Sequence, residues 1–442
     1  MNDKRQIFAW AMYDWANSAY ITTVTVAVLP IFFADVVVGT EGFTVGGWTF
    51  RATTLWAWMV GFSAFVIFLS APVLGAIADF SASKKRFLMT FCWMGSLSTL
   101  LLLFCGPGDV WKTMAVFIVA QVGFVGGNVF YDAFLPEIAS EDKLDRVSGK
   151  GFAYGYIGGG LQFAVSLGLI AGHGILGISQ SLAARLAMVM AGLWWGGFSV
   201  VTFLMLRENG RPQPMPESYR RMNRWLSYPL IGIRRTISTA VMAGKFKHLL
   251  LFLVSFMIYN DGIQTVITLA TIYGSQELGL SATDLLLTLL IIQFVAFGGA
   301  LLFARLGEKY SAKRALIISL VLWTGVVIYA YFMTSAAEYY VLGIVVGLCM
   351  GGSQALSRSL YSSMIPVEAS AEFFGFYSVF NKFSAIWGPL VFGIIDAATG
   401  SSRQALISLV VFFIAGIVLL AFLDVAKAAE AKEMNLFADD AG

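Results

Sequence analysis

An acid and an amide near the start of the chain are the first side chains whose spacing could do chemistry. Asp14 and Asn17 are one helical turn apart, with Tyr13 beside them, inside an apolar stretch that begins near Ile7. In a membrane span such an acid costs about 2.5 to 3.5 kcal/mol, so it calls for a partner, a water-filled cavity or a function. Asp14 could hold a substrate amine or a proton, or it could cap local polar groups at the interface.

A second acid lies well inside a later apolar stretch. Asp261 follows Asn260 and precedes Gln264. Near the middle of a membrane it should face a central cavity, and Gly262 could let the helix break there, as in the discontinuous helices of transporters. The alternative is that the span begins later, which would place Asp261 in the interface.

A lysine in the same kind of setting is the complementary charge. Lys382 follows Asn381 inside an apolar stretch, where it could pair with an acid or bind a carboxylate. It could also extend to the membrane surface. In the cavity, opposite Asp14 or Asp261, it would suit a zwitterionic ligand.

Two further sets of charges suggest contacts that open and close. Asp132 and Arg358 end two stretches at near-equivalent places of an internal repeat, so they could form an ion pair between two halves, or each could pair locally. Asp79, with Lys85 and Arg86, is expected to form a clamp on the cytoplasmic side. An acid at a helix end can also meet the N-terminus of a neighbouring helix.

Neutral polar residues on separate stretches are the expected wall of a cavity. They are Gln162, Gln264, Gln293 and Gln354. Neither histidine has a companion acid or cysteine in a catalytic pattern, and no phosphate-binding loop is present. We therefore expect no catalytic residue, no metal site and no cofactor. Energy would come from a solute or proton gradient, or the protein would only facilitate movement.

Composition indicates which elements must position these side chains. The 442 residues are 58% hydrophobic and 12% charged, with a mean hydropathy of +0.77. In a soluble domain about a quarter of the residues are charged. Twelve stretches match the roughly 20 apolar residues needed for one membrane-spanning helix. The sequence predicts an all-α membrane protein of twelve transmembrane helices.

Positive charge predicts the orientation and the division of the chain. Of 29 lysine and arginine residues, 23 fall on one side if both termini are cytoplasmic. The longest polar segment reads as a linker with an amphipathic helix on the cytoplasmic membrane surface. The predicted parts are a first six-helix bundle, the linker, a second six-helix bundle and a cytoplasmic tail, at residues 1–206, 207–247, 248–424 and 425–442.

The two predicted bundles resemble each other at an offset of roughly 225 to 230 positions, which indicates pseudo-symmetry. Gly126-Gly127 matches Gly351-Gly352, and Ser83-Lys-Lys-Arg-Phe-Leu88 matches Ser311-Ala-Lys-Arg-Ala-Leu316. The segment 134–140 (FLPEIAS) likewise matches 364–370 (MIPVEAS). Three matches in the same order favour duplication.

The loop 75–86 (GAIADFSASKKR) resembles the signature loop of the major facilitator superfamily. The chain departs from that family at Ser81 to Ser83, where a glycine is usual, and at Gln121, where many members have an arginine. The second departure puts the proton-coupling arrangement of drug exporters in doubt.

A narrower resemblance is to the vacuole effluxers, the autophagy-related amino-acid effluxers and their bacterial relatives. It rests on the segments 13–20 (YDWANSAY) and 131–138 (YDAFLPEI). The resemblance implies the major facilitator fold and efflux or exchange of amino acids or similar solutes.

These observations favour a secondary transporter that moves a small solute by alternating access, with proton coupling as an option. We expect a monomer in a bacterial inner membrane, whose partners are the small-molecule substrate, the lipid bilayer and protons, and no nucleic acid. The alternative is a multi-span membrane enzyme or receptor-like scaffold, which would need a catalytic cluster or a large soluble domain.

Overall fold

Among the residues that the structure describes, twelve helical segments are long and apolar enough to cross a membrane, and they make up most of the chain. The computed structural model describes residues 1–220, 222–243 and 247–429. The spans are Lys4–Val38, Ala52–Ser81, Lys84–Phe104, Val110–Ile138, Glu141–Ala171, Gln180–Met205, Lys247–Leu278, Ala282–Tyr310, Ala312–Phe332, Ala336–Met364, Val367–Thr399 and Ser402–Phe422. In a bilayer every backbone polar group must be paired within the protein, and helices achieve this within each span.

The helices and strands take the following bounds. The first half contains α1 (Lys4–Ala19), η1 (Tyr20–Val28), α2 (Leu29–Phe32), η2 (Phe33–Val38), β1 (Phe43–Val45), β2 (Trp48–Phe50), α3 (Ala52–Ser81), α4 (Lys84–Leu101), η3 (Leu102–Phe104), α5 (Val110–Ala133), α6 (Leu135–Ile138), η4 (Glu141–Lys143), α7 (Leu144–Ala171) and α8 (Gln180–Met205). The remainder contains α9 (Glu217–Arg220), α10 (Arg224–Ala243), α11 (Lys247–Leu278), α12 (Ala282–Tyr310), α13 (Ala312–Phe332), α14 (Ala336–Met364), η5 (Val367–Ala369), α15 (Ser370–Phe383), α16 (Trp387–Thr399), α17 (Ser402–Ser408), α18 (Val410–Phe422) and α19 (Val425–Ala429).

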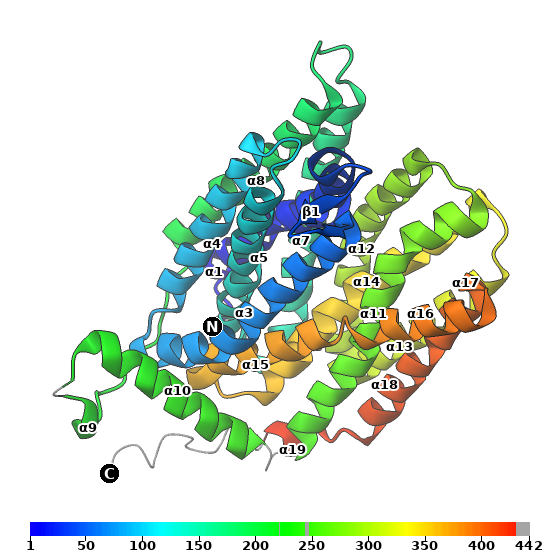
Figure 1. The fold of residues 1–442 in the computed structure, drawn as a ribbon. Coiled ribbons are helices and arrows are strands. Elements are labelled where there is room, and N and C mark those ends of the chain that lie inside the picture. The colour runs from blue at the N-terminus through cyan, green and yellow to red at the C-terminus, as the bar shows by residue number, and fades with distance from the viewer. Residues whose placement is uncertain (221, 244–246, 430–442) are drawn as a thin grey trace.

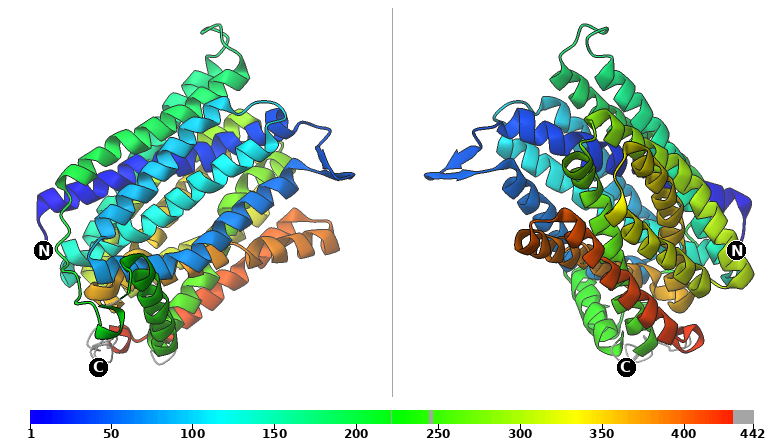
Figure 2. Two further views of the ribbon diagram at one scale, coloured as in Figure 1. Left: turned by 60° about the vertical axis from the view of Figure 1, so that its left-hand side comes forward. Right: turned by 90° about the vertical axis from the view of Figure 1, so that its right-hand side faces the viewer.

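The spans group into two six-helix bundles, as the sequence predicted (Figures 1 and 2). Where the bundles meet, α7 packs along α12 and α3 packs against α15. Because the described spans are even in number, the start of α1 and helix α19 lie on one side of the molecule, which we call the terminal face. Helices α10 and α19 lie on this face (Figure 1), and the short antiparallel pair of β1 and β2 lies on the opposite face (Figure 2).

The first span changes its winding part-way across the membrane. It begins as the α-helix α1, continues as the π-helix η1, and passes through Pro30 into a second π-helical segment, η2. A π-helix rotates the residues that follow it about the helix axis, and it is common at functional sites. The sequence predicted a membrane-spanning helix here from its apolar length alone, so the change of winding is a finding of the structure.

The eleventh span is broken in the middle. Helix α15 ends at Phe383 and α16 begins at Trp387, with a turn between them. By contrast, α11 runs without interruption through Gly262, whose missing side chain makes room for Phe412 and Phe413. The predicted break at Gly262 is therefore wrong, because that glycine serves close packing.

The segment between the halves folds back over the terminal face. Residues 207–216 lead to α9 and then to α10, which crosses the ends of the spans (Figure 1). Residues 221 and 244–246 of the predicted linker, and residues 430–442 of the predicted tail, lie outside the described residues.

Candidate functional site

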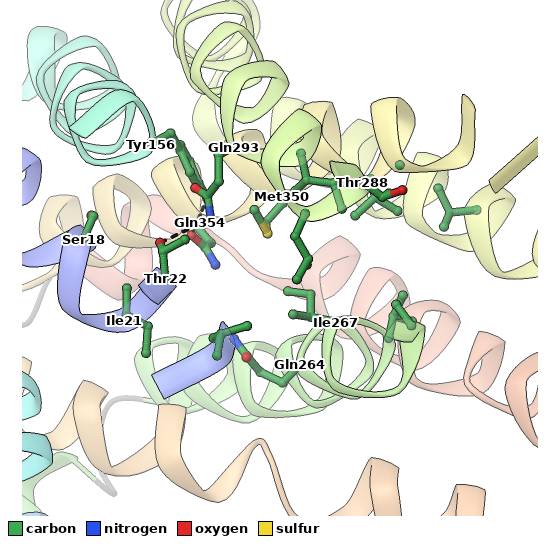
Figure 3. A pocket seen from close by; sticks show the side chains of 18 of the residues that line it. Ser18, Ile21, Thr22, Tyr156, Gln264, Ile267, Thr288, Gln293, Met350 and Gln354 are labelled. Atoms are coloured by element: carbon green, nitrogen blue, oxygen red, sulfur yellow. Dashed lines mark hydrogen bonds between the residues drawn. The ribbon is translucent and has the colours of Figure 1, made fainter. Parts of the chain in front are cut away.

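A cavity of about 420 Å³ lies between the two halves. Figure 3 shows Ser18 and Thr22 of the first span on one side, with Gln293, Gln354 and Tyr156 gathered nearby and Gln264 across the space. The cavity extends to Tyr273 and Met333, close to the opposite-face ends of α11 and α13. Its walls therefore come from both bundles.

One stripe of the first span faces this cavity. Its members are spaced three and four residues apart, as one face of a helix requires, and they are Asp14, Asn17, Ser18, Ile21 and Thr22. Asn17 Nδ2 donates to Asn128 Oδ1 at 2.6 Å. Across the interface, Gln293 Nε2 donates to Thr22 Oγ1 at 3.3 Å, and Tyr156 OH donates to Gln354 Oε1 at 2.6 Å.

Asp14 lies where the cavity meets charges from the other half. Its carboxylate accepts a hydrogen bond from Tyr131 OH at 3.0 Å and lies 3.5 Å from Arg358 Nη1. The residue is 8% exposed, and it lines both this cavity and a smaller one of about 200 Å³. Asp14 can therefore be reached by a ligand while it also touches the contact between the halves.

Arg358 is held on all sides in the smaller cavity. Nη1 lies 2.9 Å from Asp132 Oδ1, Nε donates to Ser148 Oγ at 3.0 Å, and Nη2 donates to the Ser148 carbonyl oxygen at 2.9 Å. The guanidinium also lies over the rings of Phe152 and Trp10, at 4.0 and 4.8 Å from their centroids. The planar guanidinium can make all of these contacts at once, whereas an ammonium could not.

Lys382 contributes a cation to both cavities. It is partly buried, and no described residue pairs with its ammonium by a hydrogen bond or ion pair. Its neighbour Asn381 accepts a hydrogen bond from Asn260 Nδ2 at 2.9 Å. An ammonium without a protein partner can bind a carboxylate of a ligand.

The rest of the larger cavity is an apolar hollow inside the second half. Its lining comes from α11 to α14 and includes Ile267, Leu289, Ile292, Val326 and Met350. The charged end and the apolar hollow are continuous, so the cavity suits a molecule with polar groups at one end and an apolar part at the other.

A buried cluster of charges joins the halves on the terminal face. Lys84 Nζ lies 2.9 Å from Asp79 Oδ1 and 2.6 Å from Glu137 Oε1, and it donates to Ser370 Oγ at 2.7 Å. Asp79 accepts backbone hydrogen bonds from Ala371 and Glu372 at the start of α15, at 3.2 and 2.8 Å. We call these contacts the α3–α15 clamp.

The basic partner in this clamp differs from the predicted one. Lys84 holds Asp79, whereas Arg86 is exposed and Lys85 donates to the Leu206 carbonyl oxygen at 2.7 Å. Ala82 takes a left-handed conformation with φ of 47°, which turns the chain so that the first residue of α4 points back at α3. Arg86, two residues later, then points away.

A second contact between the halves joins α7 to the ends of α12 and α14. Ser359 Oγ donates to Asp145 Oδ1 at 2.5 Å, and Lys143 Nζ lies 3.8 Å from Glu308 Oε1. We call this the α7–α14 contact. Together with the clamp and Arg358, it places the charged contacts between the halves on the terminal side of the cavity.

The chain matches known proteins along nearly its whole length. A family model described as vacuole effluxer Atg22 like matches residues 2–433. The chain belongs to this family. A Bacillus subtilis protein named as an uncharacterized MFS-type transporter, YxiO, is 34% identical over 425 residues, covering 95% of this chain and 94% of that protein. Autophagy-related protein 22 of Coccidioides immitis is 26% identical over 419 residues, covering 78% of this chain and 68% of that protein.

Solved structures share the fold of this Atg22-like chain. The human organic anion transporter MFSD10 matches with a TM-score of 0.70 and 14% identity, over 94% of this chain and 99% of that chain. FucP, a major facilitator superfamily transporter solved in the outward conformation, matches with a TM-score of 0.67 and 13% identity, over 95% and 98%. Major facilitator membership and the twelve-helix fold, both predicted from sequence, are confirmed.

Three residues predicted for the site lie away from the cavity in this family member. Tyr13 and Gln162 are buried within the first half, where the Tyr13 ring packs on Tyr131 and Gln162 binds Thr23 and Ser166. Both are polar residues on the inward side of their bundle rather than on the cavity side.

Asp261 is the third of these residues, and its side chain binds backbone amides of α16. Its carboxylate accepts hydrogen bonds from the backbone amides of Trp387 and Gly388, at 3.0 and 2.9 Å. The break in the eleventh span leaves these first amides of α16 without partners in their own helix, and an acid there also suits the helix dipole. The predicted role of Asp261 in the cavity is replaced by a cap on α16.

Other predicted positions do line cavities, and further wall residues were not singled out from the sequence. Asp14, Asn17, Gln264, Gln293 and Lys382 line the larger cavity, and Asn260, Asp132 and Arg358 line the smaller one. The added residues are Ser18, Thr22, Asn128 and Tyr156. Ser18 could have been found from its spacing to Asp14, whereas Tyr156 lies among the glycines of α7 and had no such signal.

Proposed function

We propose that this chain is a secondary transporter that moves a zwitterionic small molecule with an apolar side chain, such as an amino acid, by alternating access. The observation that carries the proposal is that Asp14 and Lys382 line the same cavity between the halves. Membership of the vacuole effluxer family and the transporter names of its relatives support transport as the activity.

The geometry supports one orientation of the substrate. Its ammonium group would bind Asp14, close to Asn17 and Asn128, and its carboxylate would bind Lys382. The apolar side chain would enter the hollow near Ile267. Each polar group of the substrate then meets the opposite charge in a cavity between the halves, where charge interactions are stronger than in bulk water.

Substrate binding would act on the contact between the halves through Asp14. An ammonium group or a proton that neutralises this carboxylate weakens its attraction for Arg358, 3.5 Å away. Arg358 would then be held to the first half chiefly by Asp132 and Ser148. This arrangement supports coupling of substrate or proton binding to opening on the terminal face.

The orientation of the chain, its membrane, its moving units and its oligomeric state are part of the same proposal. We infer that both termini are cytoplasmic, because 23 of the 29 basic residues then fall on that side. A bacterial plasma membrane fits the Bacillus relative. The moving units are residues 1–206 and 248–424, joined by residues 207–247, and the protein acts as a monomer.

Binding and transport measurements test this proposal. Thermal unfolding of purified protein with a panel of amino acids, sugars and organic acids should show stabilisation by zwitterions with an apolar side chain. Lys382→Ala and Asp14→Asn should each abolish the ligand-induced rise in melting temperature and uptake into proteoliposomes. Ser70→Ala, outside the cavity lining, is the control and should retain both. Wild-type uptake by both cavity variants would rule out the site.

A further inference from the structure

A buried ion pair connects the linker helix α10 to the second half. Arg235 Nη2 lies 3.7 Å from Glu372 Oε2, and the two side chains are 2% and 0% exposed. Among the described residues this is the one ion pair that Glu372 makes. A carboxylate this buried is costly without a cation, so the pair matters to whichever arrangement of helices contains it.

Helix α10 is fastened to the first half. Gly232 packs where a Cβ atom would lie 3.0 Å from the Val73 carbonyl oxygen of α3, and the rings of Tyr228 and Phe80 are 6.0 Å apart. The backbone amide of Gln213, in the segment before α9, donates to the Phe80 carbonyl oxygen at 2.9 Å. Arg235 itself donates to Gln213 Oε1 at 3.0 Å. Arg235 is therefore attached to α3 and should move with the first half.

Glu372 belongs to the second half and lies in the α3–α15 clamp. Its backbone amide donates to Asp79 Oδ2 at 2.8 Å, while its side chain meets Arg235. A movement that separates α15 from α3 therefore breaks both contacts of this residue. The linker helix thus spans the closed face from the first half to the second.

We propose that α10 is a lock on the closed terminal face, and that Arg235 is the positioning residue that keeps Glu372 and the start of α15 against α3. This inference rests on the alternating access proposed above. The linker then does more than join two bundles, because it stabilises one of the two states between which they move. Opening on this face separates Arg235 from Glu372 and gives the freed carboxylate to water.

Accessibility of the interface from the terminal face tests the lock. Ala71 of α3 is 4% exposed and packs against Gly375 of α15, so a cysteine there is shielded while the clamp is closed. The test protein carries Ala71→Cys and serine at the three native cysteines. A membrane-impermeant maleimide is applied to inside-out vesicles. Glu372→Gln and Arg235→Gln should each raise the labelling rate, by about tenfold.

Two matched proteins separate a lock from general damage. The charge exchange Arg235→Glu with Glu372→Arg should return the labelling rate toward that of the parent. Arg211→Gln, at an exposed arginine in the segment before α9, should leave the rate unchanged. The proposal is overturned by parent-like labelling in both single variants, by an equal increase in Arg211→Gln, or by a charge exchange that restores nothing.

A milder substitution keeps the test informative if Glu372→Gln or Arg235→Gln fails to fold. Glu372→Asp keeps the charge and lengthens the pair, so it should give a smaller increase in labelling, and a parent-like rate would overturn the lock. Labelling needs no substrate. A lock that responds as expected in a protein that transports nothing would refute the proposed function and leave the lock standing.

Discussion

Arg358 connects the cavity to the closed terminal face within one side chain. Its Nη1 atom lies between Asp14, which a ligand can reach, and Asp132, which lines the smaller cavity only. Because one cation is shared by two acids, a change in charge at Asp14 alters how firmly Arg358 is held at Asp132. A ligand bound at Asp14 would therefore change how strongly Arg358 holds the two halves together.

Removing this shared cation should be severely destabilising. Arg358→Gln leaves Asp14 and Asp132 buried without their cation, and breaking a buried ion pair costs about 3 to 5 kcal/mol. We expect the free energy of unfolding, measured by detergent titration of the purified protein, to fall by this amount. Arg86→Gln, at an exposed arginine, is the control and should change it by less than about 0.5 kcal/mol. Equal values for both variants would contradict the role given to Arg358.

At this scale, helical spacing indicated which side chains share a face, while their role in binding stays a prediction. Asp14 and Asn17 were predicted as one polar face of the first span, and both line the cavity. Tyr13 could not be separated from them, because adjacent residues of a helix point about 100° apart and sequence alone does not say which direction is the cavity. Lys84 was missed for a similar reason: one residue of three consecutive basic ones faces inward, and the left-handed turn at Ala82 decides which.

The elements explain the remaining differences between prediction and structure. Twelve spans could be counted from hydrophobicity, because a membrane allows little else of that length and composition. The break in the eleventh span had no comparable signal. Its stability depends on Asp261, which lies more than a hundred residues earlier in the chain, so the cap exists only in the folded arrangement.

A substitution of that cap should affect stability without affecting ligand recognition. Asp261→Asn keeps one acceptor for the α16 amides but removes the charge, which should lower the free energy of unfolding by about 1 to 2 kcal/mol. The rise in melting temperature produced by a bound zwitterion should stay as large as in the unmodified protein. Lys382→Ala is the opposite case, with stability kept and the ligand response lost. Loss of the ligand response in Asp261→Asn would instead indicate that Asp261 takes part in ligand binding.

Close approach of α3 and α15 gives a second test at the level of elements. A Cβ atom on Gly75 would overlap the backbone of Ala371, whereas a Cβ atom on Gly61 of the same helix would meet open space. Gly75→Ala should therefore force the two helices apart, at a cost of about 1 to 3 kcal/mol. Labelling of a cysteine at position 71 from the terminal face should rise in Gly75→Ala and stay unchanged in Gly61→Ala. Equal labelling would show that α3 and α15 tolerate separation without opening.

For the whole molecule, the contacts that join the halves are unequal on the two sides of the repeat. The offset that aligns Ser83 with Ser311 places Gly307 opposite Asp79. In the α3–α15 clamp, Asp79 accepts two backbone amides and pairs with Lys84. In the α7–α14 contact, the acid is Asp145 on the other helix, in space left by Gly307, and Ser359 donates to it. The two contacts occupy equivalent places in the repeat, and the buried Lys84–Asp79 ion pair is found in the clamp, so we expect that side of the terminal face to be held more strongly.

This inequality predicts different effects of the same substitution in the two contacts. Asp79→Asn removes the charge that pairs with buried Lys84 and should cost about 3 to 5 kcal/mol, whereas Asp145→Asn weakens one hydrogen bond and should cost about 0.5 to 1.5 kcal/mol. Labelling at position 71 should accordingly rise far more in Asp79→Asn, by at least about tenfold over the Asp145→Asn rate. If both variants open the face equally, the halves separate as rigid bodies that need every contact alike. If Asp79→Asn alone opens it, α15 leaves α3 first and the α7–α14 side acts as the hinge.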